Sequence, residues 1–323
     1  MNLERYALTL PITEFPIVQG TNNTIIGIRT KDRDYVLKRY DVPHGIDGIQ
    51  YEHTVLTWLD KQNLSFAVPA PIKTTDGRTL DQDANGHYAL MPLLQGHRPD
   101  HQNPHQIEAL GAALGELHTV LNTYPTTPRP HAVLFNDLGN IHPLVPNPET
   151  LTPQDVGWPQ TTLAETHCAW LREEIASLNT FLRETYNTLP KQVIHGDMAP
   201  SNTLYHNNQI SAVLDFEFTG PDVRMIDIAS GLKFSMRIWE NDDPLEIGAH
   251  FFRGYQNKVK LTEIERASLI DIMILRDVAS VIWRLGLNLA TNTTPDTGRI
   301  EDLRQSKTWL TTHRTQLEDL CSA

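Results

Sequence analysis

Hydrophobic and polar positions alternate in the first third of the chain. Residues 23–30 and 35–40 form two such stretches that flank a charged turn at 31–34, an arrangement typical of a β-hairpin. Two more strands are predicted at 70–73 and 87–91, where turn residues bound short apolar runs. Together these segments predict a small antiparallel sheet.

A helical spacing dominates the rest of the chain. Apolar residues recur every three or four positions in four segments, which are expected to be helices: 50–59, 104–121, 163–188 and 269–290. A link at 41–48, which contains Gly and Pro, is expected before the first of them. Asn103 is the predicted N-cap of the second helix. Charged residues interrupt the last helix, so a buried or amphipathic helix is expected there rather than a membrane span.

Composition limits the class of protein. A chain of 323 residues with 40% apolar side chains is long enough to bury the cores of two lobes. Its 27 basic and 39 acidic residues give a formal charge of −12, which disfavours nucleic acid and anionic membranes as partners. The two cysteines, Cys168 and Cys321, support neither a disulfide framework nor a zinc site. No signal peptide is recognised at the N-terminus, so a cytoplasmic location is expected.

The segment 193–202 and the apolar run that ends at Asp215 carry the candidate chemistry. Asp197 is followed by an Asn five residues later, Asn202, and by Asp215 thirteen residues beyond that. This order matches the catalytic-loop Asp, the catalytic-loop Asn and the metal-binding Asp of kinases. Phosphoryl transfer needs one carboxylate to orient a hydroxyl, and an amide oxygen and a second carboxylate to hold Mg²⁺. We therefore assign Asp197 to the hydroxyl, and Asn202 and Asp215 to the metal.

The residues of these motifs resemble those of a particular group of kinases. The loop reads His-Gly-Asp, and Asp215 begins Asp-Phe-Glu, as in the aminoglycoside phosphotransferase, choline kinase and homoserine kinase superfamily, with the homoserine kinase-like branch closest. The resemblance implies an α+β, bilobal protein-kinase-like fold that uses ATP and Mg²⁺. It divides the chain into a nucleotide-binding lobe, 1–92, and a catalytic and substrate lobe, 93–323, with a hinge at about 91–96.

The same resemblance assigns the nucleotide-binding residues. A turn containing Gly20, Asn22 and Asn23 precedes the hairpin and offers backbone amides to phosphate. Lys38, near the end of the second strand, is the candidate for the α- and β-phosphates. Alternation sends its neighbour Arg39 to the opposite face of the sheet.

Three further residues complete the predicted nucleotide site. Glu52, on the first helix, is the carboxylate chosen to position Lys38. Main-chain groups near Met91 and Leu93 are expected to hydrogen-bond adenine at the hinge. Each of these has a plain structural reading as well, because a Glu at a helix start and a strand exit are both common.

Residues outside the catalytic loop are expected to support it. The segment 220–229 is expected to open a helix, and the superfamily pattern implies that Asp227 hydrogen-bonds the backbone of the catalytic loop. His195 and His118 are interpreted as structural. The connection 124–159 contains eight prolines and no sustained period, and it is either a plain link or a cover over the acceptor pocket.

The acceptor remains open at this point, although a small-molecule hydroxyl is expected and homoserine is favoured. A carboxylate on the acceptor calls for a cation, and the candidates are Arg224, Arg276 and Arg284. A choline or ethanolamine kinase instead calls for an aromatic cage, and the candidates are Trp239, Tyr255 and Trp283. An aminoglycoside kinase calls for an acidic cleft. A noncatalytic nucleotide-binding protein is the alternative of another class, although it is expected to have lost Lys38 or one of the three loop residues.

Overall fold

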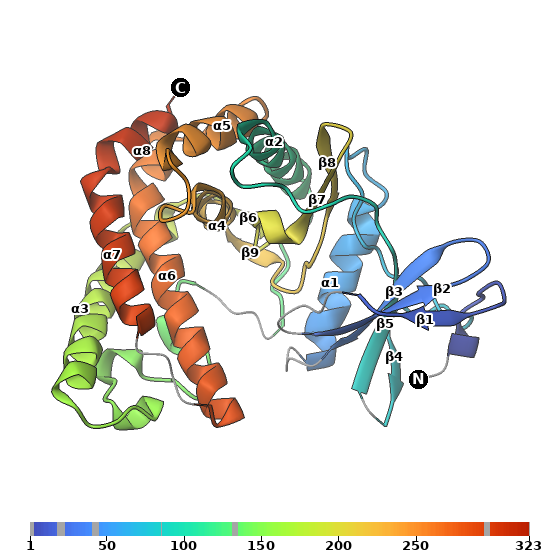
Figure 1. Cartoon of the computed structure of the whole chain (residues 1–323), viewed down its shortest axis with the longest axis horizontal. Coiled ribbons are helices and arrows are strands. Elements are labelled where there is room, and N and C mark those ends of the chain that lie inside the picture. The colour runs from blue at the N-terminus through green and yellow to red at the C-terminus, as the bar shows by residue number, and fades with distance from the viewer. Residues whose placement is uncertain are drawn as a thin grey trace.

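A computed structural model describes most of the chain, namely residues 3–17, 23–40, 45–84, 86–130, 135–293 and 298–322. A twisted sheet with one helix beside it lies at one end of the molecule, and a larger assembly of helices lies at the other (Figure 1). The chain is therefore an α+β protein, as predicted.

Antiparallel pairing joins all the strands of the described ranges. They are β1 (Thr13–Phe15), β2 (Thr24–Arg29), β3 (Asp34–Tyr40), β4 (Asp81–Asp83), β5 (Gly86–Pro92), β6 (Lys191–Ile194), β7 (Thr203–His206), β8 (Gln209–Val213) and β9 (Gly220–Val223). The first five form one sheet in the order β1-β2-β3-β5-β4, whereas β6 pairs with β9 and β7 with β8. Strands β2 and β3 are the predicted hairpin.

The helices lie mostly, but not only, in the second half of the chain. They are α1 (Gly45–Leu59), α2 (Pro104–Leu121), α3 (Thr162–Glu184), α4 (Met225–Met236), α5 (Pro244–Gln256), α6 (Glu263–Thr291), α7 (Gly298–Thr312) and α8 (Arg314–Leu320). Helix α2 packs on α5 and α4, and the long helix α6 packs on α4, α7 and α3 (Figure 1). Within the described ranges, none of these helices combines the length and the apolar character needed to cross a bilayer.

Local sequence signals set several of these boundaries. The Asn103 side chain accepts hydrogen bonds from the backbone amides of His105 and Gln106, so the predicted N-cap of α2 is confirmed. Helix α6 begins with a capping box, in which the Thr262 side chain bonds the amide of Glu265 and the Glu265 carboxylate bonds back to the amide of Thr262. Helix α6 also confirms the amphipathic helix predicted at 269–290.

Two expectations about the sheet and the first helix were wrong. Residues 70–73 are not a strand, because Pro71 has no N–H to donate to a ladder. Only Ile72 bonds the sheet, through its N–H to the carbonyl of Leu90 at 2.7 Å. The first helix starts at Gly45 rather than after the link predicted at 41–48, of which 41–44 lie outside the described residues.

A third expectation was wrong at residues 220–229. The first part of this segment is β9, and α4 begins only at Met225. Pro221 fits the strand because β6 and β9 form a sheet of two edge strands, in which a missing N–H can face away from the partner. Helix 163–188 also ends early, at Glu184, and a 3-10 turn covers 186–188.

Alternation along β3 places neighbouring residues in different environments. Leu37 packs with Ile28 and Leu90 in a small apolar cluster on one face of the sheet. Lys38 is buried as well, but it bonds Glu52 of α1 and therefore lies on the other face. The sheet thus presents a buried cation to the helix beside it.

Candidate active site

The part of the site that is expected to hold the nucleotide, called the nucleotide side below, is built around Lys38. Its Nζ atom donates to Glu52 Oε1 at 3.2 Å and to Asp215 Oδ1 at 3.4 Å. The Lys38 and Glu52 side chains are only 8% and 3% exposed, whereas that of Asp215 is 41% exposed. The structure therefore brings together three sequence candidates that come from β3, α1 and the end of the β7–β8 hairpin.

Electrostatics keep Lys38 charged despite its burial. Desolvation by itself lowers the pKa of Lys38, but the negative charges of Glu52, Asp215 and Glu217 outweigh it and hold the pKa well above its usual value. A lysine that stays protonated in a buried position is a fixed cation. Such a cation suits the binding of phosphate oxygens.

His53 follows Glu52 on α1 and is held in its neutral form. Burial, followed by the charge of Lys38, lowers the pKa of His53 to about 3. Its ring nitrogens lie 2.9 Å from the hydroxyls of Tyr40 and Thr79. The unfolded chain takes up a proton here below a pH of about 6.5, whereas the folded chain does not, so this group makes stability fall as the pH drops below 6.5.

We expect His53→Gln to flatten the acid side of the stability profile. From the two pKa values, the free energy of unfolding of the wild-type protein should fall by about 2 kcal/mol between pH 7 and pH 5 because of His53. The variant should not show this loss. Urea unfolding at both pH values measures this difference. Parallel profiles for the two proteins would show that His53 is charged in the folded state.

Asn202 and Asp215 are suited to a divalent cation. Asn202 Nδ2 donates to Asp197, both to its carbonyl at 2.8 Å and to its Oδ2 at 3.0 Å, which leaves Asn202 Oδ1 as the end able to bind a cation. The N–H of Leu214 donates to the Asn202 carbonyl at 2.8 Å, which fixes the loop beside Asp215. Asp215 has a φ of 62°, a left-handed conformation, and its carboxylate is partly exposed to solvent.

The donor atoms of Asn202 and Asp215 fit an Mg²⁺ ion that is also bound by substrate phosphates. They fit a metal ion bound by protein alone less well. Within the described ranges, no group of three or more His, Cys, Asp or Glu side chains is arranged to hold a metal ion. Mg²⁺ is usually held by one or two protein groups together with substrate phosphates, and it prefers amide and carboxylate oxygens. Asn202 and Asp215 supply such oxygens.

Glu217, the last residue of Asp-Phe-Glu, links two other segments of the chain to the nucleotide side. Its Oε2 atom accepts a hydrogen bond from Asn23 Nδ2 at 2.5 Å, which ties the start of β2 to the site. Arg129 donates to the carbonyls of Glu217 and Thr219. Arg129 lies in the proline-rich connection, where no periodic pattern indicates its role.

The remaining nucleotide candidates are only partly placed. Gly20 and Asn22 lie outside the described residues. Met91 is a buried residue of β5 that pairs with Val36. The N–H of Leu93 already donates to the Asp34 carbonyl at 3.2 Å, so of the two Leu93 main-chain groups the carbonyl is the one available for adenine.

Asp227 anchors the catalytic loop. Its buried carboxylate accepts hydrogen bonds from the backbone N–H groups of His195 and Gly196, both at 2.8 Å. His118 Nε2 lies 3.1 Å from the same carboxylate, and its other ring nitrogen contacts the hydroxyl of Tyr255. Burial alone would raise the pKa of Asp227. The hydrogen bond and charge of His118 outweigh burial and hold the pKa below its usual value, so the carboxylate stays ionised.

Gly196 and His195 shape the loop on either side of this anchor. Gly196 has a φ of 87°, and a Cβ atom there would lie 2.4 Å from the carbonyl oxygen of Phe218, so only glycine fits. His195 Nε2 lies 2.8 Å from the Leu214 carbonyl. His195 thus links the loop to the residue before Asp215, which agrees with its interpretation as structural.

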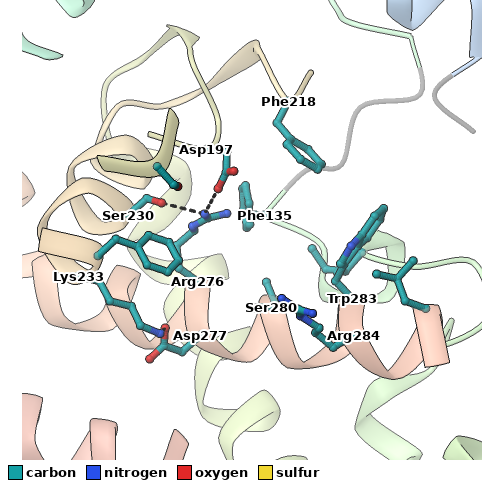
Figure 2. Close-up of a pocket in the computed structure, with 15 residues that line it drawn as sticks. Phe135, Asp197, Phe218, Ser230, Lys233, Arg276, Asp277, Ser280, Trp283 and Arg284 are labelled. Atoms are coloured by element: carbon teal, nitrogen blue, oxygen red, sulfur yellow. Dashed lines mark hydrogen bonds and ion pairs between the residues drawn. The ribbon is translucent and has the colours of Figure 1, made fainter. Parts of the chain in front are cut away.

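Asp197 lies between the nucleotide side and a pocket. Arg276 Nη2 donates to Asp197 Oδ1 at 3.1 Å and to Ser230 Oγ at 3.0 Å (Figure 2). The Arg276 guanidinium also lies 4.7 Å from the centre of the Phe135 ring. Sequence reasoning proposed Arg276 only for acceptor binding, and its contact with Asp197 had no sequence signal.

The pocket beside Asp197 has a volume of about 340 Å³. One wall is aromatic and includes Phe135, Phe218 and Trp283, and the floor is the α6 face that carries Arg276 and Arg284 (Figure 2). Phe135 belongs to the connection 124–159, so this segment contributes to the pocket rather than only joining two helices. The pocket therefore offers both apolar surface and charge next to the candidate catalytic carboxylate.

The acceptor candidates separate in space. Arg276, Arg284 and Trp283 line the pocket. Arg224 instead forms an ion pair with Glu265, with its Nε 2.6 Å from Oε1. The three aromatic residues do not form a cage, because Tyr255 is fully buried against His118 and Trp239 lines a neighbouring cavity.

Comparison with known proteins agrees with this geometry. Residues 15–269 match the phosphotransferase enzyme family. The chain is 27% identical over 286 residues to a homoserine kinase of Zymomonas mobilis subsp. mobilis, which covers 87% of this chain and 82% of that protein. It is 26% identical over 275 residues to a homoserine kinase of Granulibacter bethesdensis, which covers 83% of this chain and 78% of that protein.

Solved structures share the fold. An amicoumacin kinase in complex with AMP-PNP and Ca²⁺ superposes with a TM-score of 0.68 at 18% identity, over 98% of this chain and 91% of that one. A microcompartment-associated aminopropanol kinase gives a TM-score of 0.68 at 17% identity, over 99% and 94%. The fold is thus protein-kinase-like. The chain belongs to the phosphotransferase enzyme family and is a small-molecule kinase.

Proposed function

We propose that this enzyme transfers the γ-phosphoryl group of MgATP to the hydroxyl of a small amino acid, with homoserine as the favoured acceptor. The observation that carries the proposal is the position of Asp197, which contacts Asn202 and also lines the pocket. The curated relatives named homoserine kinase, which align with most of this chain, support the choice of acceptor.

Each candidate residue has one role in the proposed reaction. The acceptor hydroxyl oxygen attacks the γ-phosphorus, the bond from that phosphorus to the ADP oxygen breaks, and the hydroxyl proton passes to Asp197 or through it to water. Lys38, held by Glu52, binds phosphate oxygens of the nucleotide. Asn202 and Asp215 hold the Mg²⁺ ion, which when bound neutralises charge on the phosphates.

The nucleotide is proposed to bind where residues 1–92 meet residues 93–323. Adenine lies against the main chain of 91–96, and the turn of Gly20, Asn22 and Asn23 offers its amides to phosphate. The bond between Asn23 and Glu217 supports this placement, because it connects the two parts across the site. We also propose that the enzyme works in the reducing cytoplasm, which agrees with the two free, buried cysteines.

An amino alcohol is the second candidate acceptor. The aromatic wall of Phe135, Phe218 and Trp283 is the observation that favours it, because aromatic faces attract ammonium groups. The structural neighbour named aminopropanol kinase points the same way. Against it stands Arg276, whose guanidinium already occupies the face of Phe135.

ADP release across an acceptor panel tests the proposal. The panel contains homoserine, threonine, choline, ethanolamine, methylthioribose and aminoglycosides, with the rate without acceptor as the baseline. We expect homoserine to raise the rate most. Stimulation by choline or ethanolamine alone would replace the amino acid with an amino alcohol. MgATP binding without stimulation by any acceptor would favour a noncatalytic nucleotide-binding protein.

A further inference from the structure

Arg284 differs from Arg224 and Arg276, the two other arginines considered for the acceptor. Arg224 is neutralised by Glu265, and Arg276 by Asp197. For Arg284, the part of the chain that the structure describes provides neither a hydrogen bond nor an ion pair with an acidic side chain, although Arg284 lines the pocket. A cation in this position is available to a ligand.

The charges that line the pocket leave one cation in excess. Two ion pairs account for four of the five charged side chains: Asp197 with Arg276, and Asp277 with Lys233. Asp277 is further bound by the hydroxyl of Ser306 at 3.1 Å. Arg284 is the fifth charged residue, so the pocket as a whole is cationic and repels an acceptor whose only charge is positive.

The surroundings of Arg284 reinforce this preference. Arg284 is a solvent-exposed residue, yet partial desolvation lowers its pKa, and the like charge of Arg299 at the start of α7 lowers it further. Both effects disfavour the charged guanidinium, and the attraction of an anionic partner would offset both. A carboxylate, which can accept two parallel N–H bonds from an arginine, matches such a site.

The register of α6 places Arg284 on the face that carries Arg276. The two residues are eight positions apart, a rise of about 12 Å along the helix, and Ser280 lies between them. Figure 2 shows all three projecting from α6 into the pocket that Asp197 also lines. One small molecule of the proposed class can therefore present its hydroxyl to Asp197 and its carboxylate towards the Arg284 side chain.

We propose that Arg284 binds the carboxylate of the acceptor and is the residue by which this kinase distinguishes hydroxy amino acids from amino alcohols. This inference rests on the proposed function, because it assigns one contact to the same acceptor. The aromatic wall remains as the apolar side of the pocket.

A pair of acceptors isolates this contact. The two molecules, homoserine and 3-amino-1-propanol, differ only by the carboxylate. We expect Arg284→Gln to raise the KM for homoserine by about 10²-fold, the loss typical of a charge-assisted hydrogen-bonded pair. The kcat/KM for 3-amino-1-propanol should stay within about threefold of wild type or rise, since that acceptor has no carboxylate to lose. Arg284→Lys keeps the charge and should give an intermediate KM for homoserine.

Two controls separate specificity from general damage. Arg304→Gln makes the same change of charge on α7, where Arg304 pairs with Glu301 and does not line this pocket, and it should leave both acceptors unaffected. The Kd for MgATP should be the same in all variants. An unchanged KM for homoserine in Arg284→Gln, with wild-type activity on homoserine, overturns the inference alone. A wild-type enzyme that phosphorylates 3-amino-1-propanol but not homoserine overturns the proposed function, and the inference with it.

Discussion

Asp197→Asn is expected to lower turnover by about 10²-fold or more while leaving MgATP binding nearly intact. An amide has nearly the shape of the carboxylate, but it cannot take the proton of the acceptor hydroxyl. The proposed phosphate contact of Lys38 and the proposed metal contacts of Asn202 and Asp215 do not depend on the Asp197 carboxylate. Steady-state turnover with homoserine and a nucleotide-binding titration on the same samples measure the two effects separately.

Asp271→Asn is the matched control for this substitution. Asp271 lies on the same helix as Arg276, is 38% exposed, and pairs with Arg314 away from the pocket. The same chemical change there should leave turnover near the wild-type value. Near-wild-type turnover in Asp197→Asn would remove Asp197 from the mechanism.

Asp215→Asn is expected to weaken Mg²⁺-dependent nucleotide binding. Asn tolerates the left-handed backbone at this position, with its φ of 62°, whereas Ala would add strain that confuses the result. The variant keeps an oxygen but loses its negative charge. We expect the affinity for MgATP to fall by about 10- to 100-fold or more, since losses of this size are typical of perturbed metal sites.

Titration with and without Mg²⁺ isolates this effect. In the presence of EDTA, the affinities of Asp215→Asn and wild type for ATP should be similar or favour the variant, because a carboxylate repels phosphate when no metal lies between them. The affinities should diverge as Mg²⁺ is added. Equal Mg²⁺ dependence in the two proteins would place the metal elsewhere.

Features set by neighbouring residues could be predicted from the sequence. The hairpin of β2 and β3 follows from alternation, and α2 follows from its N-cap at Asn103 and its regular apolar stripe. The candidate set of Lys38, Glu52 and Asp215 came from a motif and a resemblance, and these residues lie within hydrogen-bonding distance. Their roles in catalysis remain predictions.

Features that depend on distant contacts could not be predicted. The start of the segment 220–229 is a strand rather than the expected helix start, because β9 pairs with β6. Pairing with a partner strand, rather than local sequence, determines the conformation of such a short segment. Arg276 reaches Asp197 across 79 residues of sequence, and no local period encodes that contact. Phe135 lines the pocket from a proline-rich connection, where neither a helical nor a strand period exists.

Detection of the phosphorylated product tests the proposed function most directly. The enzyme is incubated with MgATP and homoserine, and the products are followed by phosphorus NMR and mass spectrometry, with Asp197→Asn as the parallel sample. We predict one phosphohomoserine for each ADP in the wild-type reaction and a rate lower by about 10²-fold or more in the variant. ADP formation without phosphohomoserine, or equal rates in the two proteins, would contradict transfer to homoserine at Asp197.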